Sequence, residues 1–145
     1  MDARYRLAPM RELRARDERL RGGDLAGAVS DARTLAADVE QAATRVTCAQ
    51  AALAAATATR GRVLATGAAS ATIAQLERYL SRLRGELAAV RGEFLRADAR
   101  HRGQQDVVDA ARGRLALARA DREIIERHFA AWRASRRKLA ERRED

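Results

Sequence analysis

The chain has 145 residues, of which 3% are aromatic, so it has too few bulky apolar side chains for a thick globular core. Its single cysteine, Cys48, excludes an internal disulfide and a cysteine metal cluster. The formal net charge is +9 and 28 of the 29 basic residues are arginine, which favours an acidic partner such as nucleic acid, anionic lipid or an acidic protein surface. No stretch of about 18 residues is apolar throughout and the first residues form no apolar run, so we expect a cytoplasmic protein without a transmembrane segment or secretory signal.

The first predicted helix covers about residues 8–65. Pro9 suits its first turn, where the missing N–H needs no partner. From Leu25 to Val63, apolar and small residues recur at alternating steps of three and four. This is the spacing of a coiled-coil seam, the row of side chains that faces a partner helix.

Nearer the N-terminus the seam is predicted to shift by one residue, because Met10, Leu13 and Leu20 fit the same spacing only in an offset register. The offset falls at the glycine pair Gly22 and Gly23. A glycine inside a helix costs about 1 kcal/mol relative to alanine, so we expect a bend, a weak point or a full break at this pair.

The turn between the helices is predicted at about residues 66–71, where small uncharged residues gather. Gly67 suits a helix end, because glycine readily adopts the left-handed conformation found there. Either Ser70 or Thr72 can cap the next helix, and Thr72 with Gln75 fits a capping box.

The second predicted helix covers about residues 72–142. Steps of three and four from Ile73 to Leu139 meet twenty positions, and only four of them are polar: His101, Gln104, Arg122 and Arg136. Folding the chain about the turn pairs small residues with large ones, for example Ala56 with Leu80, which fills a thin core without voids. With the shifted register, the predicted pairs near the termini are Leu20 with Leu115, Met10 with Ile125 and Leu7 with Phe129. We therefore predict an all-α fold, in which two long helices form an antiparallel coiled-coil hairpin and residues 1–145 form a single domain.

Nothing in the sequence indicates catalysis, since it lacks a glycine-rich phosphate loop and a slender hairpin has no concave pocket to exclude water. We expect no enzyme activity, cofactor, bound metal or small-molecule substrate. His101 and Gln104 occupy adjacent seam layers opposite Leu35 and Ala32. Either they form a polar notch that fixes the register of the two helices, or they are polar seam residues that stay open to water.

The end of the second helix is the candidate partner-binding site. The first helix is predicted to end its pairing near Leu7, so Trp132 continues the seam without an intramolecular partner and should be exposed. Tryptophan and arginine are the residue types enriched at interface hot spots. The predicted contact residues are Trp132, Arg133, Arg136, Arg137 and Arg142. The alternative is a frayed, solvated helix end in which Trp132 folds back on Phe129.

The chain resembles the central-stalk proteins of bacterial type III secretion, the YscO/FliJ family, over nearly its whole length. The likeness is carried by the charged hairpin, by the N-terminal stretch YRLAPMRELRARDERL and by the C-terminal stretch REIIERHFAAWRASRRKLAERRED. In the first stretch an aromatic–x–Leu start, Tyr5 and Leu7, precedes Met10 and an arginine-rich turn. The chain departs from the family in the glycine pair and the alanine-rich seam, which put the stiffness of its N-terminal third in doubt.

The resemblance implies a non-enzymatic stalk on the cytoplasmic side of a membrane-embedded secretion apparatus, similar to the coiled-coil shaft of the rotary ATP synthase. Such a stalk inserts into the hexameric secretion ATPase, promotes its activity and links it to the export gate protein. Some members also handle secretion chaperones.

Two alternatives remain open from the residues alone. A basic coiled coil can bind nucleic acid through arginine–phosphate contacts. Against this, the charge is spread as +3 over residues 1–72 and +6 over residues 73–145, and no stacking aromatics line the hairpin. The second alternative is a structural coiled-coil scaffold that assembles with itself.

Overall fold

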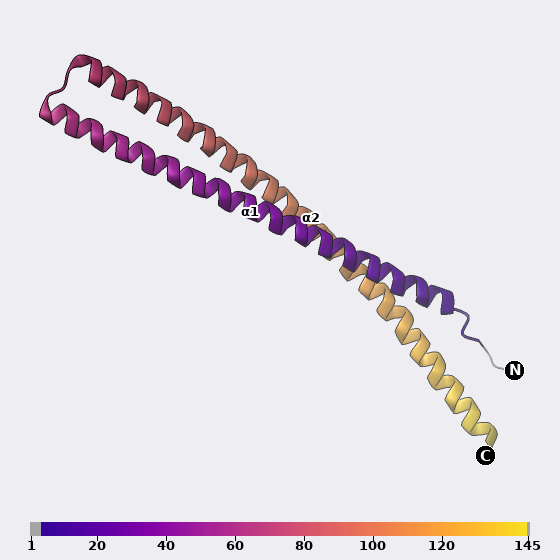
Figure 1. The fold of residues 1–145 in the computed structure, drawn as a ribbon. Coiled ribbons are helices and arrows are strands. Elements are labelled where there is room, and N and C mark those ends of the chain that lie inside the picture. The colour runs from indigo at the N-terminus through magenta and orange to yellow at the C-terminus, as the bar shows by residue number, and fades with distance from the viewer. Residues whose placement is uncertain (1–3, 145) are drawn as a thin grey trace. The chain divides into compact units, whose positions relative to one another are not determined.

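The computed structural model describes residues 4–144 of the chain. It contains two α-helices, α1 (Ala8–Thr66) and α2 (Ser70–Glu144), which pack against each other and are joined by a short turn (Figure 1). Within the described residues no strand is present. The predicted all-α class, with two long helices in a hairpin, is therefore confirmed. Neither helix is long and apolar enough over its described residues to cross a membrane.

The turn is made by the helix end at Gly67, as predicted. Its φ of 75° lies in the left-handed region that a side chain disfavours. The backbone N–H groups of Thr72 and Ile73 donate to the carbonyl oxygen of Ala69, at 3.0 and 3.2 Å. Because α2 already begins at Ser70, Thr72 lies inside the first turn, and the predicted capping box at Thr72 is wrong.

The glycine pair does not break α1. Gly22 and Gly23 are both helical, within a single element that runs from Ala8 to Thr66. The penalty of about 1 kcal/mol for each glycine is small beside the cooperativity of a long helix that is packed along its length. The predicted full break at this pair is therefore wrong.

The chain divides into two compact units, which are described separately. The turn unit comprises residues 31–105. The terminal unit comprises residues 1–30 and 106–145, of which 4–30 and 106–144 are described.

The turn unit has an apolar seam built from small and large residues. Ala56, Leu80 and Leu83 form a buried cluster against which Leu53 packs, and Leu80 is only 1% exposed. Full burial of a leucine side chain is worth about 1.5–3 kcal/mol. This cluster confirms the predicted pairing of Ala56 with Leu80.

Ion pairs between the helices flank the seam of the turn unit. Arg60 pairs with Glu77 at 2.5 Å, and Arg45 pairs with Glu93 at 3.2 Å. The members of each pair lie on opposite helices at matching distances from the turn, as the antiparallel register requires.

His101 and Gln104 are both half-buried at the seam of the turn unit. The His101 Nε2 atom lies 3.2 Å from Nε2 of the exposed Gln105 one turn later. His101 therefore forms its polar contact along its own helix, as expected for seam polarity that is open to water.

The terminal unit buries a row of α2 side chains at steps of three, four, three and then seven: Val108, Ala111, Leu115, Ala118 and Ile125. On the N-terminal side of this unit the buried residues are Tyr5 and Ala28. The predicted seam of α2 thus continues through this unit.

The offset seam predicted for the start of α1 is wrong. Met10, Leu13 and Leu20 are exposed by 41%, 55% and 60%. Arg11 and Glu18 are half-buried instead. They lie fourteen and seven residues before Leu25, so they continue the register of the seam at Leu25 without a shift.

The physical reason is that an unbroken helix keeps its phase, so the face of α1 that meets α2 at Leu25 meets it again two turns earlier. That face carries charged side chains, whose aliphatic stems can cover apolar residues while their ends reach ionic partners. Met10 and Leu20, which are 41% and 60% exposed, are left outside, so they do not fill the seam layers predicted for them opposite Ile125 and Leu115.

Candidate interaction surface in the terminal unit

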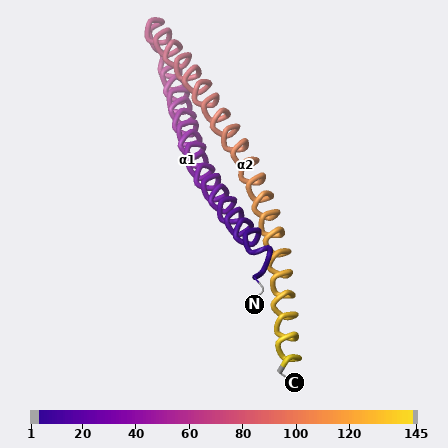
Figure 2. Tube along the Cα trace, turned by 90° about the vertical axis from the view of Figure 1, so that its right-hand side faces the viewer, coloured from indigo at the N-terminus to yellow at the C-terminus, as the bar shows by residue number. Residues whose placement is uncertain are grey.

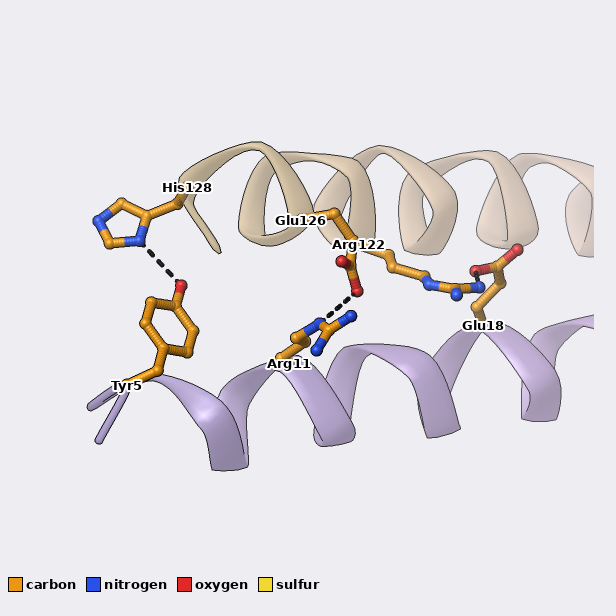
Figure 3. A network of polar contacts seen from close by, with 6 residues as sticks. All are labelled: Tyr5, Arg11, Glu18, Arg122, Glu126 and His128. Carbon is orange, nitrogen blue, oxygen red and sulfur yellow. Dashed lines mark hydrogen bonds and ion pairs between the residues drawn. The ribbon is translucent and has the colours of Figure 1, made fainter. Parts of the chain in front are cut away.

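The short segment before α1 lies beside α2 in the terminal unit (Figure 2). It places Tyr5 in a group of rings. The Tyr5 hydroxyl lies 2.8 Å from Nδ1 of His128 (Figure 3). Its ring meets Phe129 edge-on at 4.9 Å between centroids and lies 5.2 Å from the Trp132 ring. These four residues are called the aromatic cluster below, and their edge-to-face and offset geometries are the favourable ones for aromatic pairs.

Trp132 therefore has an intramolecular partner, which corrects the expectation that it would be exposed. It is half-buried, contacts Tyr5, and stacks on Phe129 with 5.8 Å between centroids and 20° between planes. The sequence interpretation ended the pairing near Leu7 and so left Tyr5 out of the site. The available signal was that Tyr5, one of only five aromatic residues, stands just ahead of the first helix.

One side of Trp132 still reaches the surface. Trp132, Tyr5 and His128 line a shallow depression of about 500 Å³, together with residues 4, 6 and 7. The depression combines apolar rings with the basic side chains Arg4 and Arg6. It is therefore suited to an apolar group that is attached to an acidic segment.

Arg11 connects the aromatic cluster to a row of ion pairs. Its guanidinium carbon lies 4.2 Å from the centroid of the Phe129 ring, within the range of a cation–π contact. Its Nε donates to Glu126 Oε1 at 2.7 Å. One arginine thus fixes two neighbouring side chains of α2.

Further ion pairs join α1 to α2 in this unit (Figure 3). Glu18 accepts from Arg122 at 2.7 Å on one oxygen and lies 3.5 Å from Arg119 on the other. Arg14 pairs with Asp121 at 3.0 Å. These contacts replace the leucine pairs that the offset register had predicted.

The two glutamates at these contacts have lowered pKa values. The hydrogen bond from Arg11 is the main cause that lowers the pKa of Glu126, and the hydrogen bond from Arg122 is the main cause that lowers the pKa of Glu18. The same bonds raise the pKa values of Arg11 and Arg122. Both pairs are therefore fully charged at neutral pH.

The last part of α2 is strongly basic. Six of the eleven residues 133–143 are basic and one, Glu141, is acidic. We call these residues the basic tail; its basic side chains are Arg133, Arg136, Arg137, Lys138, Arg142 and Arg143.

Most charges of the basic tail are uncompensated. Arg133 lies over the Phe129 ring at 5.8 Å from its centroid. Among the side chains that the structure describes, the other five cations form no ion pair. The predicted contact residues Trp132 and Arg133 thus adjoin the aromatic cluster, whereas Arg136, Arg137 and Arg142 lie farther along the same helix.

The arrangement places a half-buried tryptophan beside a row of cations that form no ion pair among the described side chains. Tryptophan and arginine are the residue types enriched at interface hot spots. No protein-family model matches the chain, and neither a curated protein nor a solved structure matches it.

Proposed function

We propose that this chain is a non-enzymatic central stalk of a bacterial type III secretion system. In this role it binds and activates the hexameric export ATPase and links it to the export gate protein. The observation that carries the proposal is the basic tail, whose cations have no ionic partner among the described side chains. The resemblance of the two terminal stretches to the stalk family adds the particular partner.

The physical chemistry of the tail fits a shaft inside a ring. A pore formed by six similar subunits presents the same groups repeatedly, so a narrow helix that carries charge on several sides can make many weak contacts there. Arg137 and Arg142 are exposed, and Arg136 is half-buried. Rim charges of this kind raise association rates and make binding sensitive to salt.

Trp132 supplies the anchor in this proposal. One side of its ring is covered by Tyr5 and Phe129, which fixes its orientation before the partner arrives. Pre-ordering of an anchor side chain lowers the entropy lost on binding.

The test is to add the purified chain to a hexameric type III secretion ATPase from the same organism and to measure its turnover. We expect turnover to rise with a saturable dependence on the chain. The variant with glutamine at Arg133, Arg136, Arg137 and Arg142 should lose most of this activation at low salt. The difference from the unmodified chain should shrink as the salt concentration rises, because salt screens the arginine contacts.

The matched control removes the same charge from the turn unit. Glutamine replaces four exposed arginines that form no ion pair among the described side chains: Arg33, Arg78, Arg84 and Arg91. This variant should activate as the unmodified chain does. No rise in turnover at saturating chain, or equal loss in both variants, would count against the proposal.

A further inference from the structure

The terminal unit carries an apolar surface that the seam does not use. Leu13, Leu20, Leu117 and Ile124 are exposed by 55%, 60%, 70% and 67%. We call these four residues the outer patch. Single exposed leucines are ordinary, but a group of them on one face marks an interaction site.

The spacing of the outer patch places two residues on one face of each helix. Leu13 and Leu20 are seven residues apart on α1, and Leu117 and Ile124 are seven apart on α2. Residues separated by seven lie two turns apart on the same side of a helix. The patch therefore spans about 10 Å along each helix.

Ion pairs show that both faces point to the same side of the terminal unit. Asp121 lies four residues after Leu117 and three before Ile124, and it pairs with Arg14 at 3.0 Å. On α1, Asp17 lies one turn after Arg14, four residues after Leu13 and three before Leu20. The outer patch thus flanks the Arg14–Asp121 pair from both helices.

The other ion pairs between the helices of this unit lie toward the opposite edge of the seam. Glu126 and Arg119 flank that edge on α2, where Glu126 pairs with Arg11 and Arg119 pairs with Glu18. The outer patch is therefore a second apolar face, separate from the seam and from the basic tail. A helix pair with a second apolar face at heptad spacing is suited to accept another helix.

Charge decides which helix fits. The acidic residues that border the outer patch are already paired within the chain: Asp17 with Arg21 at 3.5 Å, Asp24 with Arg21 at 3.5 Å, and Asp121 with Arg14 at 3.0 Å. In contrast, Arg114, one turn before Leu117 on α2, forms no ion pair among the described side chains. The charge left free around the patch is therefore positive.

We propose that the outer patch binds an amphipathic helix of a partner protein, with leucine-type side chains at heptad spacing and acidic side chains beside them. A second copy of this chain fits poorly. It brings a net charge of +9, and the carboxylates that border its own patch are already paired. An acidic helix instead gives Arg114 the ionic partner that it lacks.

The experiment uses the full chain and a synthetic labelled helix of about four heptads, with leucine at the a and d positions and glutamate beside them. Binding is measured by fluorescence anisotropy. We expect saturable binding that weakens at least about tenfold in the double variant Leu20→Gln and Leu117→Gln. The matched control, Leu64→Gln with Leu95→Gln, removes two exposed leucines of the turn unit and should leave the Kd unchanged.

A second probe tests the charge argument on the unmodified chain, so that it does not depend on the folding of a variant. A peptide with lysine in place of glutamate should bind at least about tenfold more weakly at low salt. Equal binding of the two peptides, or no binding of the acidic peptide, would overturn the proposal.

Two further outcomes would assign the patch to another occupant and overturn the proposal. The first is a dimer of the chain alone in sedimentation that the Leu20→Gln and Leu117→Gln variant dissolves. The second is capture by vesicles of phosphatidylcholine and phosphatidylglycerol that this variant loses, while the acidic peptide does not bind. Circular dichroism of each variant checks that the helices are retained.

Discussion

The turn unit and the terminal unit use the same two helices in different ways. In the turn unit both helices contribute apolar or small seam residues, and Leu80 is almost completely buried against Ala56. In the terminal unit α2 keeps an apolar seam, but α1 meets it with charged side chains such as Arg11 and Glu18. Both units bury apolar residues, and the terminal unit adds to this burial several ion pairs between the helices and a group of aromatic contacts.

This difference separates stability from recognition. Apolar burial is insensitive to pH and salt, whereas half-exposed ion pairs are individually weak and respond to both. The terminal unit also carries the outer patch and the basic tail. The unit in which α1 presents charged side chains to α2 is thus the one that contains both proposed binding surfaces.

The largest expected effect is in the core of the turn unit. Leu80→Ala should lower the free energy of unfolding by about 2–5 kcal/mol, because it leaves a cavity beside Ala56 and Leu83. Urea denaturation followed by circular dichroism measures the change. Leu95→Ala, at a position that is 65% exposed, should change it by less than about 0.5 kcal/mol. Similar losses in the two variants would contradict a core at Leu80.

A smaller effect is expected in the aromatic cluster. Tyr5→Ala removes the contact with His128 and the ring contacts with Phe129 and Trp132, which together are worth about 1–2 kcal/mol. Trp132 is the single tryptophan, so its fluorescence reports on this cluster alone.

The Trp132 emission should shift to the red in the Tyr5→Ala variant, because the ring becomes more exposed to water. The matched control is Tyr79→Ala, which removes the other tyrosine from an exposed position in the turn unit. It should leave the emission unchanged. An unshifted spectrum in Tyr5→Ala would mean that Tyr5 does not cover Trp132.

The smallest expected effect is on the stability of the fold at acidic pH. The pKa values of Glu18 and Glu126 lie below the ordinary value of 4.5 in the folded chain, because Arg122 and Arg11 donate to their charged forms. A carboxyl with a depressed folded pKa stabilises the fold above its unfolded pKa. This contribution is lost as the pH falls from about 4.5 through the lowered pKa values.

The measurement is the urea stability of the chain at a series of pH values from neutral down to below 4.5. The double variant Glu18→Gln and Glu126→Gln should show a flatter decline than the unmodified chain. Glu141→Gln, in the basic tail, should decline as the unmodified chain does. If the double variant and the unmodified chain declined equally, these two ion pairs would not contribute to the acid sensitivity.

Much of the fold could be predicted from residue spacing. Regular steps of three and four in both halves of the chain, with Gly67 between them, are enough to define two helices and an antiparallel turn. The pairing of Ala56 with Leu80 followed from the same steps, because each position is fixed by its distance from the turn.

The site was predicted less completely. The sequence indicated Trp132 and the arginines after it, but it did not indicate that Tyr5 covers the tryptophan. That contact joins residues far apart in the sequence and lies outside the regular helix spacing, so no periodicity reports it.

The sequence by itself determined that both segments are helical and where the chain turns between them. It also determined that the start of the first helix and the end of the second are basic. Only the tertiary structure decided which face of α1 meets α2 in the terminal unit. The start of α1 has leucines on one side and paired charges on another, and spacing alone favoured the leucines. The unbroken helix keeps the phase that the apolar core sets at Leu25, and so it turns Arg11 and Glu18 toward α2 and leaves the leucines for a partner.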